Sequence, residues 1–476
     1  MMIKRNDKNP SRAVAEALQK YPGPVTVADI TARTGLPLAL VQEALPRAAD
    51  EYGAGLAVTE SGEICYSFPR ILKSRRRGAR VWLRGAAERA FRRIKRAAAA
   101  LFKVWIMGML VGYFALFMLI ALAALVLSLA ASASRRDSGE HGEGGRGIFF
   151  AAGIFDLIIR LWFYSEAAKA LGPYDRGGAS LREQARGNRA KKPLHKGVFS
   201  FVFGEGDPDK DWPVQEKQGV MAYLKAHNGV ISLPEFMFLT GRPPSEAEGL
   251  ALSYCAQFGG MPEATAEGTL VYRFDQLLKQ AAPAQEAEGM PLRRLSAFSS
   301  NPKNMNIWFC VLNGVNALFG GYFLFSAGAP DPSFLYLVAG ALASLVTPDT
   351  RFILSAGLGA FPLIFSLLFW IIPAARYGLL KKRNQAVARE NQRKQGYRAI
   401  WDSPLAAGAE GAAAGPAVSI IKEMGAYAPP EAAIDSQGKT VYAFRELERE
   451  KEALRAYRSN IDPRSSDLGG IIFDTT

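Results

Sequence analysis

An uncharged stretch of 31 residues, 104–134, restricts the fold of this chain more than any other feature. It reads VWIMGMLVGYFALFMLIALAALVLSLAASAS, whereas about 20 apolar helical residues already cross the hydrocarbon core of a bilayer. The stretch lies too far along the chain to be a cleaved signal peptide. We therefore expect a permanent membrane-spanning helix.

The residues before this stretch are strongly basic. Residues 70–103 hold thirteen Lys and Arg and one acid, Glu88, in a chain whose net charge is +14. By the positive-inside rule this flank faces the cytoplasm, and its amphipathic pattern predicts an interfacial helix against anionic lipid. The residues expected to contact lipid headgroups are Arg75, Arg76, Arg77, Arg80, Arg84, Arg92, Arg93, Lys95 and Arg96.

Three further apolar stretches predict three further crossings, at residues 147–164, between 303 and 331, and at 352–375. Basic residues follow the second and the last, so four crossings with both termini in the cytoplasm satisfy the charge rule. A fifth apolar run, residues 334–346, is too short for a full crossing, and we expect a re-entrant or broken segment. The predicted location is the cytoplasmic (inner) membrane, with a multi-pass topology.

Asp156 and Arg160 lie four residues apart in the second predicted span. Ionisable groups inside a membrane often mark an ion path or a partner contact. The favoured interpretation is a shallow, short helix whose charges reach the interface or each other. The pair is nevertheless the candidate intramembrane polar site.

The soluble parts of the chain resemble each other at a constant shift of 206 residues. Each unit predicts two helices, a turn, a third helix and a hairpin, which is the order of a winged helix-turn-helix. A third, weaker copy ends in GKTVYAF, residues 438–444. The matched residues are Thr34, Gly35, Pro37, Gly62, Tyr66 and Phe68 with Thr240, Gly241, Pro243, Gly268, Tyr272 and Phe274.

The third helix of each unit would enter a DNA groove in a DNA-binding protein, but it is poor in positive charge. In the first unit Arg47 is outnumbered by Glu43 and Asp50, and the second unit carries Glu246 and Glu248. Contact with phosphates needs net positive charge. We therefore favour protein-binding or structural modules over DNA-reading modules.

The stretch FSFVFGEGDPDKD, residues 199–211, has three aspartates at every second position, as a calcium loop does. Trp212 and Gln218 then replace the Gly and Glu that calcium requires, and GEG lacks the GK[ST] of a phosphate-binding loop. We interpret the stretch as a connector that also docks against the membrane part. Its candidate residues are Phe199, Phe201, Phe203, Gly204, Gly206 and Asp207.

The residue types that carry most catalysis and metal chemistry are scarce. Cys65, Cys255 and Cys310 lie far apart without a CxxC motif, the chain has three histidines, and it has no GxSxG or HExxH. We expect no catalytic residue, no metal site and no cofactor, and hence no enzyme.

These features divide the chain into eight parts. They are a winged-helix-like module (1–70), a basic juxtamembrane helix (71–103), a transmembrane hairpin (104–164), a basic linker and connector (165–215), a second module (216–280), further transmembrane segments (304–376), a basic helix with a degenerate third module (377–459) and a disordered tail (460–476).

Several stretches resemble an uncharacterised polytopic membrane-protein family of cyanobacteria and chloroplasts. They are FSFVFGEGDPD, PEATAEGTLVYRF, FDLIIRLWFYSE and IPAARYGLLKKRNQAVARENQRK, and the likeness covers most of the chain. Plant members are often labelled iron-sulfur cluster biosynthesis proteins, a label that three separated cysteines do not support. The resemblance implies an architecture and no catalytic residues.

The predicted fold class is therefore an α-rich membrane protein with cytoplasmic winged-helix-like α+β modules in repeat. The predicted function is a non-enzymatic scaffold or adaptor that binds cytoplasmic protein partners at the membrane. Two alternatives stay open, a membrane-bound DNA-binding transcriptional regulator and a transporter or membrane enzyme that uses Asp156 and Arg160.

Overall fold

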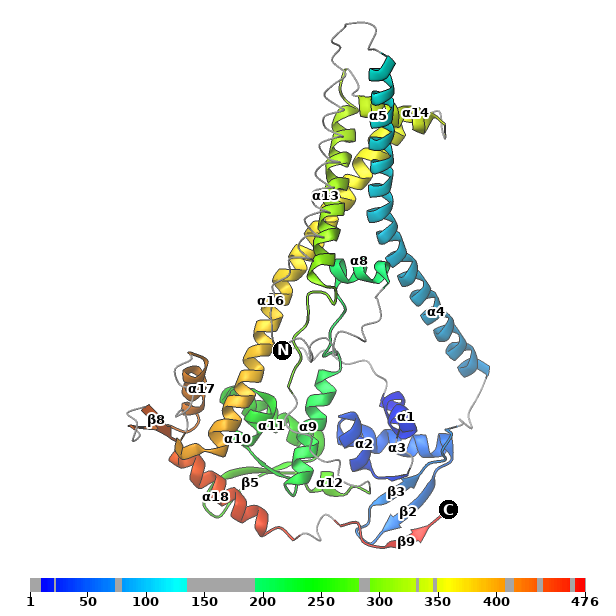
Figure 1. The fold of residues 1–476 in the computed structure, drawn as a ribbon. Coiled ribbons are helices and arrows are strands. Elements are labelled where there is room, and N and C mark those ends of the chain that lie inside the picture. The colour runs from blue at the N-terminus through cyan, green and yellow to red at the C-terminus, as the bar shows by residue number, and fades with distance from the viewer. Residues whose placement is uncertain are drawn as a thin grey trace, which may run out of the picture. The chain divides into compact units, whose positions relative to one another are not determined.

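The computed structural model describes residues 10–20, 23–72, 79–134, 193–281, 292–330, 334–345, 349–406, 415–434, 440–462 and 467–475. The chain folds into two compact units (Figure 1). Unit 1 comprises Met1–Arg84, Asp207–Ser296 and Lys382–Thr476, and unit 2 comprises Gly85–Gly206 and Ala297–Lys381.

The first part of unit 1, which we call module 1, combines three helices with a small antiparallel sheet. Its elements are α1 (Pro10–Lys20), β1 (Pro24–Val25), α2 (Val27–Thr34), α3 (Leu38–Tyr52), β2 (Gly55–Thr59) and β3 (Ile64–Ser67). The helices pack around Val14, Ile30, Val41 and Leu45, all fully buried. The sheet order is β1-β3-β2-β9, so its last strand comes from the far end of the chain.

Module 2 has the same order of elements. They are α9 (Trp212–Ala226), β4 (Val230–Ser232), α10 (Leu233–Thr240), α11 (Pro244–Phe258), β5 (Met261–Ala264) and β6 (Leu270–Arg273), followed by α12 (Asp275–Leu278). The bounds of α10, α11 and β6 are those of α2, α3 and β3 plus 206 residues. The sheet order β4-β6-β5 repeats β1-β3-β2.

Local chemistry explains why corresponding helices begin and end at corresponding residues. Thr26 with Asp29 and Ser232 with Glu235 form capping boxes at the starts of α2 and α10. At the other end, a glycine with φ of 65–68° follows each helix (Gly35 and Gly241), a conformation that residues with a Cβ rarely adopt. The predicted helix stops at these glycines are confirmed.

The third part of unit 1 contains one hairpin between helices. It includes the short helix η4 (Pro404–Ala406), α17 (Gly415–Gly425), β7 (Glu431–Ile434), β8 (Thr440–Ala443) and α18 (Arg445–Ser459). The strands form a separate two-stranded sheet. In the described residues this part lacks the third strand of modules 1 and 2.

The prediction of a disordered tail after residue 460 differs from the structure. Residues 471–474 form strand β9 (Ile471–Asp474), which pairs antiparallel with β2 in the sheet of module 1. The physical reason is that the main chain of this segment pairs with the free edge of β2, a long-range event that composition does not reveal.

Unit 2 is built around long apolar helices. Its helices are α4 (Ala79–Met107), η1 (Gly108–Gly112), α5 (Tyr113–Ser134), α8 (Leu194–Phe203), α13 (Lys303–Ser326), α14 (Phe334–Ser344), α15 (Thr350–Phe352), η3 (Ile353–Ala360) and α16 (Phe361–Asp402), the ends of α4 and α16 reaching into unit 1. Three helical stretches in the described residues are long and apolar enough to cross a membrane: Ala90–Ala130, Lys303–Ser326 and Thr350–Asp402. The fourth predicted span, 147–164, lies outside the described residues.

At two places a predicted basic part and a predicted span belong to one continuous helix. The basic residues after 79 and the apolar residues after 104 belong to one uninterrupted helix, because no glycine or proline separates them in RAAAALFKVW. The basic helix predicted after residue 377 likewise continues the last span, within α16. Helix α14 has 11 residues, too few to cross a bilayer.

Polar side chains connect the long helices at two π-helical segments. Asn316 donates to the carbonyl oxygen of Leu110 in η1 (2.8 Å), and the Tyr113 hydroxyl donates to that of Gly357 in η3 (2.9 Å). Helix α13 also approaches the last span closely, since a Cβ on Gly320 would lie 3.1 Å from the Leu363 nitrogen. Small residues and carbonyl acceptors are the usual means of packing helices in lipid.

Candidate functional site

Much of the predicted membrane chemistry falls on residues that the structure does not describe. Asp156 and Arg160, the candidate intramembrane pair, lie outside the described residues, as do Arg75, Arg76 and Arg77. Arg80 and Arg84 lie on α4, without described side chains. Four predicted lipid contacts remain.

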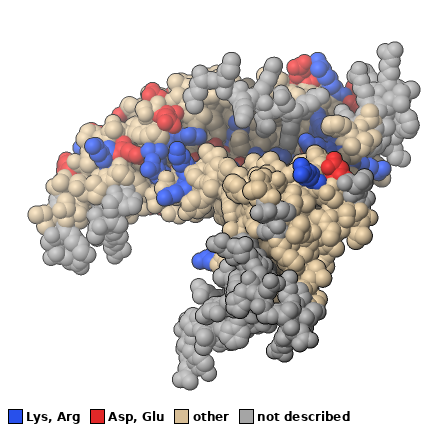
Figure 2. All heavy atoms as spheres, turned by 90° about the horizontal axis from the view of Figure 1, so that it is seen from above, with Lys and Arg blue, Asp and Glu red and all other residues tan. Residues whose placement is uncertain are grey.

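These four residues, Arg92, Arg93, Lys95 and Arg96, lie on α4 and are exposed. They precede the apolar residues of the same helix by about two turns. Figure 2 shows that Lys and Arg side chains gather in clusters, several of them beside Asp and Glu, and that large areas of the described surface are uncharged. The cations are accessible to anionic lipid headgroups.

The connector phenylalanines lie on helix α8 in unit 2. Phe201 is buried, and its ring centroid lies 5.4 Å from that of Phe369 and 6.0 Å from that of Phe309. Phe199 and Phe203 contact each other at 5.0 Å. Phe201 therefore anchors α8 to the spanning helices α13 and α16.

Arg376 of α16 fixes the end of α8. Its guanidinium donates to the carbonyl oxygens of Phe201 and Phe298, each at 2.7 Å, and it stacks on the Phe298 ring at 4.2 Å. The carbonyls in the last turn of a helix lack helical partners, so this contact acts as a cap. Gly204 leaves room for it, because a Cβ there would lie 2.5 Å from Arg376 Nη1.

The aspartates of the connector bind protein groups of unit 1. Asp207 accepts from the Asp209 N–H at 2.9 Å and forms an ion pair with Arg383. Asp209, 6% exposed, accepts from the Arg294 N–H at 2.9 Å. In the described residues no group of three acidic, His or Cys side chains could hold a metal ion. Gly206 has φ of 93° and makes the turn between helix and aspartates.

An amide clamp holds the segment before unit 2 along helix α16, and sequence reasoning missed it. Asn391 accepts from the Arg293 N–H (2.9 Å) and donates to the Arg293 carbonyl (2.8 Å). Asn384 does the same with Ser296, at 3.0 and 2.8 Å. The two asparagines are seven residues apart, hence on one helix face. Each side-chain amide pairs with both the N–H and the carbonyl of one residue, as the main chain of a neighbouring strand would. This spacing is the signal that could have revealed the clamp.

A buried ionic cluster lies beside the clamp. Lys394 is 0% exposed, with its ammonium 4.4 Å from the Trp212 ring and 3.7 Å from Glu390. Arg293 donates to the same Glu390 at 2.9 Å. Nearby, burial raises the pKa of the Glu216 carboxyl, which Lys394 opposes. The cluster joins module 2 to α16 through buried charges, each of which would be uncompensated if its partner were removed.

The exposed faces of the two modules are acidic and apolar. On α3 the exposed Arg47 pairs with Glu43 at 2.7 Å, and Asp50 is also exposed. On α11 the exposed face carries Glu246, Glu248 and Leu252, the last 49% exposed. The hairpin turns add exposed Glu60 in module 1 and exposed Glu267 in module 2, whereas Glu63 pairs with Lys279 at 2.9 Å.

A groove of about 610 Å³ lies in unit 1 between the module 2 hairpin and helix α18. Four of its lining residues are glutamates and one is Arg449. Glu450 is 8% exposed and accepts from the Tyr427 hydroxyl at 3.1 Å. Burial raises the pKa of the Glu450 carboxyl to about 7.

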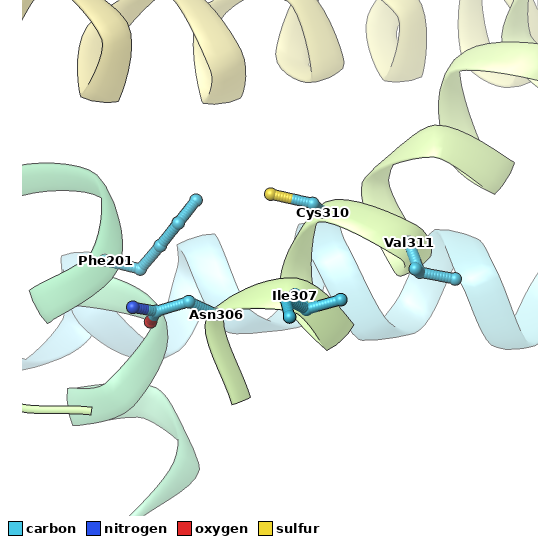
Figure 3. A pocket seen from close by; sticks show the side chains of 5 residues that line it. All are labelled: Phe201, Asn306, Ile307, Cys310 and Val311. Atoms are coloured by element: carbon cyan, nitrogen blue, oxygen red, sulfur yellow. The ribbon is translucent and has the colours of Figure 1, made fainter. Parts of the chain in front are cut away.

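A second cavity, of about 350 Å³, lies among the helices of unit 2. Figure 3 shows Phe201 and Cys310 pointing into the same space, with Asn306, Ile307 and Val311 around it. The lining is almost wholly apolar. No described acid or base in this lining could support catalysis.

A comparison of sequences identifies a distant relative. An uncharacterised chloroplastic protein of Arabidopsis thaliana is 26% identical over 289 residues, covering 58% of this chain and 51% of the relative. The chain thus spans about half the length of the curated relative that it matches. This is consistent with the predicted plant and chloroplast family.

No protein-family model matches the chain. No solved structure matches it either.

Proposed function

We propose that the chain is a membrane-anchored, non-enzymatic scaffold or adaptor that holds protein partners through its soluble modules. Modules 1 and 2 are, in this proposal, winged-helix-like units that form an internal repeat. The third part of unit 1 is a degenerate copy. The soluble modules and both termini face the cytoplasm from the inner membrane.

The element order supports the winged-helix and repeat assignments. Both modules run helix, short strand, helix, helix, hairpin, and the short strand pairs with the last strand of the hairpin. The bounds of α2, α3 and β3 recur in α10, α11 and β6 at the same offset of 206 residues that is found in the sequence. Independent units would have no reason to keep one offset across helices and strands.

The three separate chain segments that form unit 1 support four crossings. Its three chain segments pack as one compact unit, so they lie on one side of a membrane. The chain then crosses an even number of times between Arg84 and Asp207 and between Ser296 and Lys382. The second interval has α13 and α16 as crossings, so α14 does not cross. The first interval needs a return after α5, and residues 147–164 are the segment predicted for it.

The charge of the modules is the observation that carries the scaffold proposal. The third helix and the hairpin turn are the parts with which a winged helix contacts DNA, and in both modules they carry more acidic than basic residues. Acidic surfaces repel phosphates. Exposed Leu40 and Leu252 on the same helices instead suit protein partners.

The basic residues of α4 have a simpler role at the membrane. Each Lys or Arg close to an anionic surface contributes roughly 1 kcal/mol to attraction. Arg92, Arg93, Lys95 and Arg96 are exposed directly before the apolar part of α4. In the proposal they fix the depth and the orientation of that helix.

The proposal is tested by isolating the full chain from crosslinked native membranes and quantifying protein and DNA in one sample. We expect a stoichiometric protein partner and no enriched DNA. Specific DNA fragments, released steeply by salt, would favour the DNA-binding regulator instead. If neither protein nor DNA were recovered, the scaffold proposal would be wrong.

Matched variants separate binding from folding. Leu40→Lys and Leu252→Lys change exposed apolar positions, and they should reduce partner recovery at least five-fold. Gln42→Lys and Glu248→Gln change exposed polar positions of the same helices and should leave recovery unchanged. Equal loss in all four variants would contradict binding through the apolar positions.

A further inference from the structure

Strand β9 covers the outer edge of β2 in module 1. The register pairs Ala57 with Asp474 and Val58 with Phe473. The Thr475 N–H donates to the Leu56 carbonyl, and the Glu60 N–H donates to the Gly470 carbonyl, each at 2.9 Å. Without residues 467–475 this edge would present unpaired donors and acceptors.

The side chains of β9 contribute little burial. Ile471 is 63% exposed, Ile472 69% and Phe473 59%. Burial of apolar surface is the main force that holds a strand in a core. Because β9 gains little of it, main-chain hydrogen bonds supply most of its attachment, and a strand held in this way can be displaced by another.

The edge nevertheless selects a particular strand. A Cβ on Gly469 would lie 2.6 Å from Glu60 Oε2, and one on Gly470 would lie 3.0 Å from Oε1. Past the strand, Thr475 Oγ1 accepts from the Leu56 N–H at 2.8 Å. A segment that pairs with the outer edge of β2 in this way therefore has two small residues, then an apolar run, then a residue with a hydroxyl group.

In module 2 the corresponding strand, β5, carries a proline that prevents full pairing with a further strand. Pro262 of β5 lies opposite Tyr272, as Leu56 of β2 lies opposite Tyr66. The Leu56 N–H points outward to Thr475, whereas a proline has no N–H to offer. In the described residues no strand covers β5. The chain thus blocks one edge with proline and covers the other with its own segment.

We propose that the outer edge of β2 is a binding site for an extended peptide strand of a protein partner, and that residues 467–475 occupy it until that strand displaces them. Strand addition to a sheet edge takes affinity from main-chain hydrogen bonds and specificity from side chains. The partner strand has the chemistry of 467–475, with two small residues before an apolar run. The inference deepens the proposed scaffold function and rests on it for the partner.

The test uses a fluorescent peptide with the sequence of residues 467–476, DLGGIIFDTT. Anisotropy measures its binding to the full chain and to the chain that lacks these residues, both in detergent micelles. The shortened chain should bind the peptide, and the full chain at least ten-fold more weakly, because its own segment competes at high effective concentration.

Two changes make the test specific. Leu56→Pro in the shortened chain copies the residue of module 2 and should abolish binding. A peptide with Gly469→Val and Gly470→Val should lose binding to the unchanged shortened chain, which keeps the test decisive even if Leu56→Pro misfolds.

Equal binding by both chain lengths, or binding that survives the two valines, would overturn the proposal. So would dimers of the full chain formed by exchange of 467–475, because they would assign the edge to a second copy. Peptide binding without a protein partner from native membranes supports the edge site and counts against the scaffold, so the two failures are distinguishable.

Discussion

Arg458 on helix α18 forms an ion pair with Glu235, a residue of the capping box at the start of helix α10 in module 2. Its guanidinium donates to both carboxylate oxygens, at 2.9 and 2.6 Å, and to the Val230 carbonyl at 2.7 Å. The Glu235 side chain is 2% exposed. One ion pair therefore joins the third part of unit 1 to the start of a helix 223 residues earlier.

Removing Arg458 should strongly destabilise unit 1. Loss of one partner of a buried ion pair typically costs about 3–5 kcal/mol, since the other charge stays buried without compensation. We expect Arg458→Ala to lower the free energy of unfolding by about 3 kcal/mol in a denaturant titration of the micellar protein. The control Arg455→Ala, on the exposed side of α18, should change it by under about 0.5 kcal/mol. Equal effects of the two substitutions would mean that the Arg458–Glu235 ion pair does not stabilise unit 1.

Gly241 should be less replaceable than Gly35, its counterpart at the end of α2. Both have φ near 67°, so alanine costs each roughly 1–2 kcal/mol in backbone strain. A Cβ on Gly241 would also lie 2.8 Å from the main-chain oxygen of Glu390, whereas the nearest main-chain atom to one on Gly35 is the Val214 oxygen at 3.8 Å. Gly241→Ala should therefore lower the melting temperature more than Gly35→Ala. The reverse order would argue against close packing of α10 on α16.

Glu450 should make stability depend on pH near neutrality. Burial raises its pKa from 4.5 to about 7, while Tyr427 opposes the shift and Glu235 adds to it. The folded state then holds a proton that the unfolded state has released, so this group's stabilisation falls as pH rises from about 4.5 to about 7. The shift corresponds to roughly 3 kcal/mol.

Glu450→Gln should flatten that pH dependence and stabilise the protein at pH 8 relative to the natural chain. Melting curves at several pH values between 5 and 8 measure both effects. Glu446→Gln, in the same groove but on its exposed side, serves as the control and should keep the slope. An unchanged slope in Glu450→Gln would assign the pH dependence to other groups.

The amide clamp offers a test of donor and acceptor separately. Asn391→Ala leaves the N–H and the carbonyl of Arg293 without partners and should cost about 1–3 kcal/mol. Asn391→Asp keeps the acceptor, loses the donor and should cost less. Gln392→Ala, exposed on the same helix, should be near neutral. Denaturant titration of the three variants gives the order, and a neutral Asn391→Ala would contradict the clamp.

The features that the sequence predicted correctly are those that a short stretch of residues determines. The Thr-Gly helix ends at Gly35 and Gly241 and the hairpin turns at Gly62 and Gly268 follow from backbone conformation, which a short stretch specifies. The long uncharged run predicted a spanning helix from its length and apolar composition alone. These features needed no knowledge of distant residues.

The rest depends on contacts between distant parts of the chain. The hydrogen bond from Leu56 to Thr475 joins residues 419 apart, and no pattern near either residue indicates it. The ionic cluster around Lys394 was missed because a basic residue in a charged helix normally faces solvent. Continuity between span and basic helix was also missed, since a change of composition does not end a helix when no glycine or proline intervenes.

The topology can be tested by labelling single cysteines. Cys65, Cys255 and Cys310 are first replaced by alanine, and then Ser245→Cys, Asn460→Cys or Ala329→Cys is introduced at an exposed position. Ser245 and Asn460 belong to unit 1, whereas Ala329 follows α13. In sealed vesicles an impermeant maleimide should therefore label the first two from one side and Ala329→Cys only from the other. Labelling of Ser245→Cys and Asn460→Cys from opposite sides would require an odd number of crossings between them, and unit 1 could not then assemble as one body.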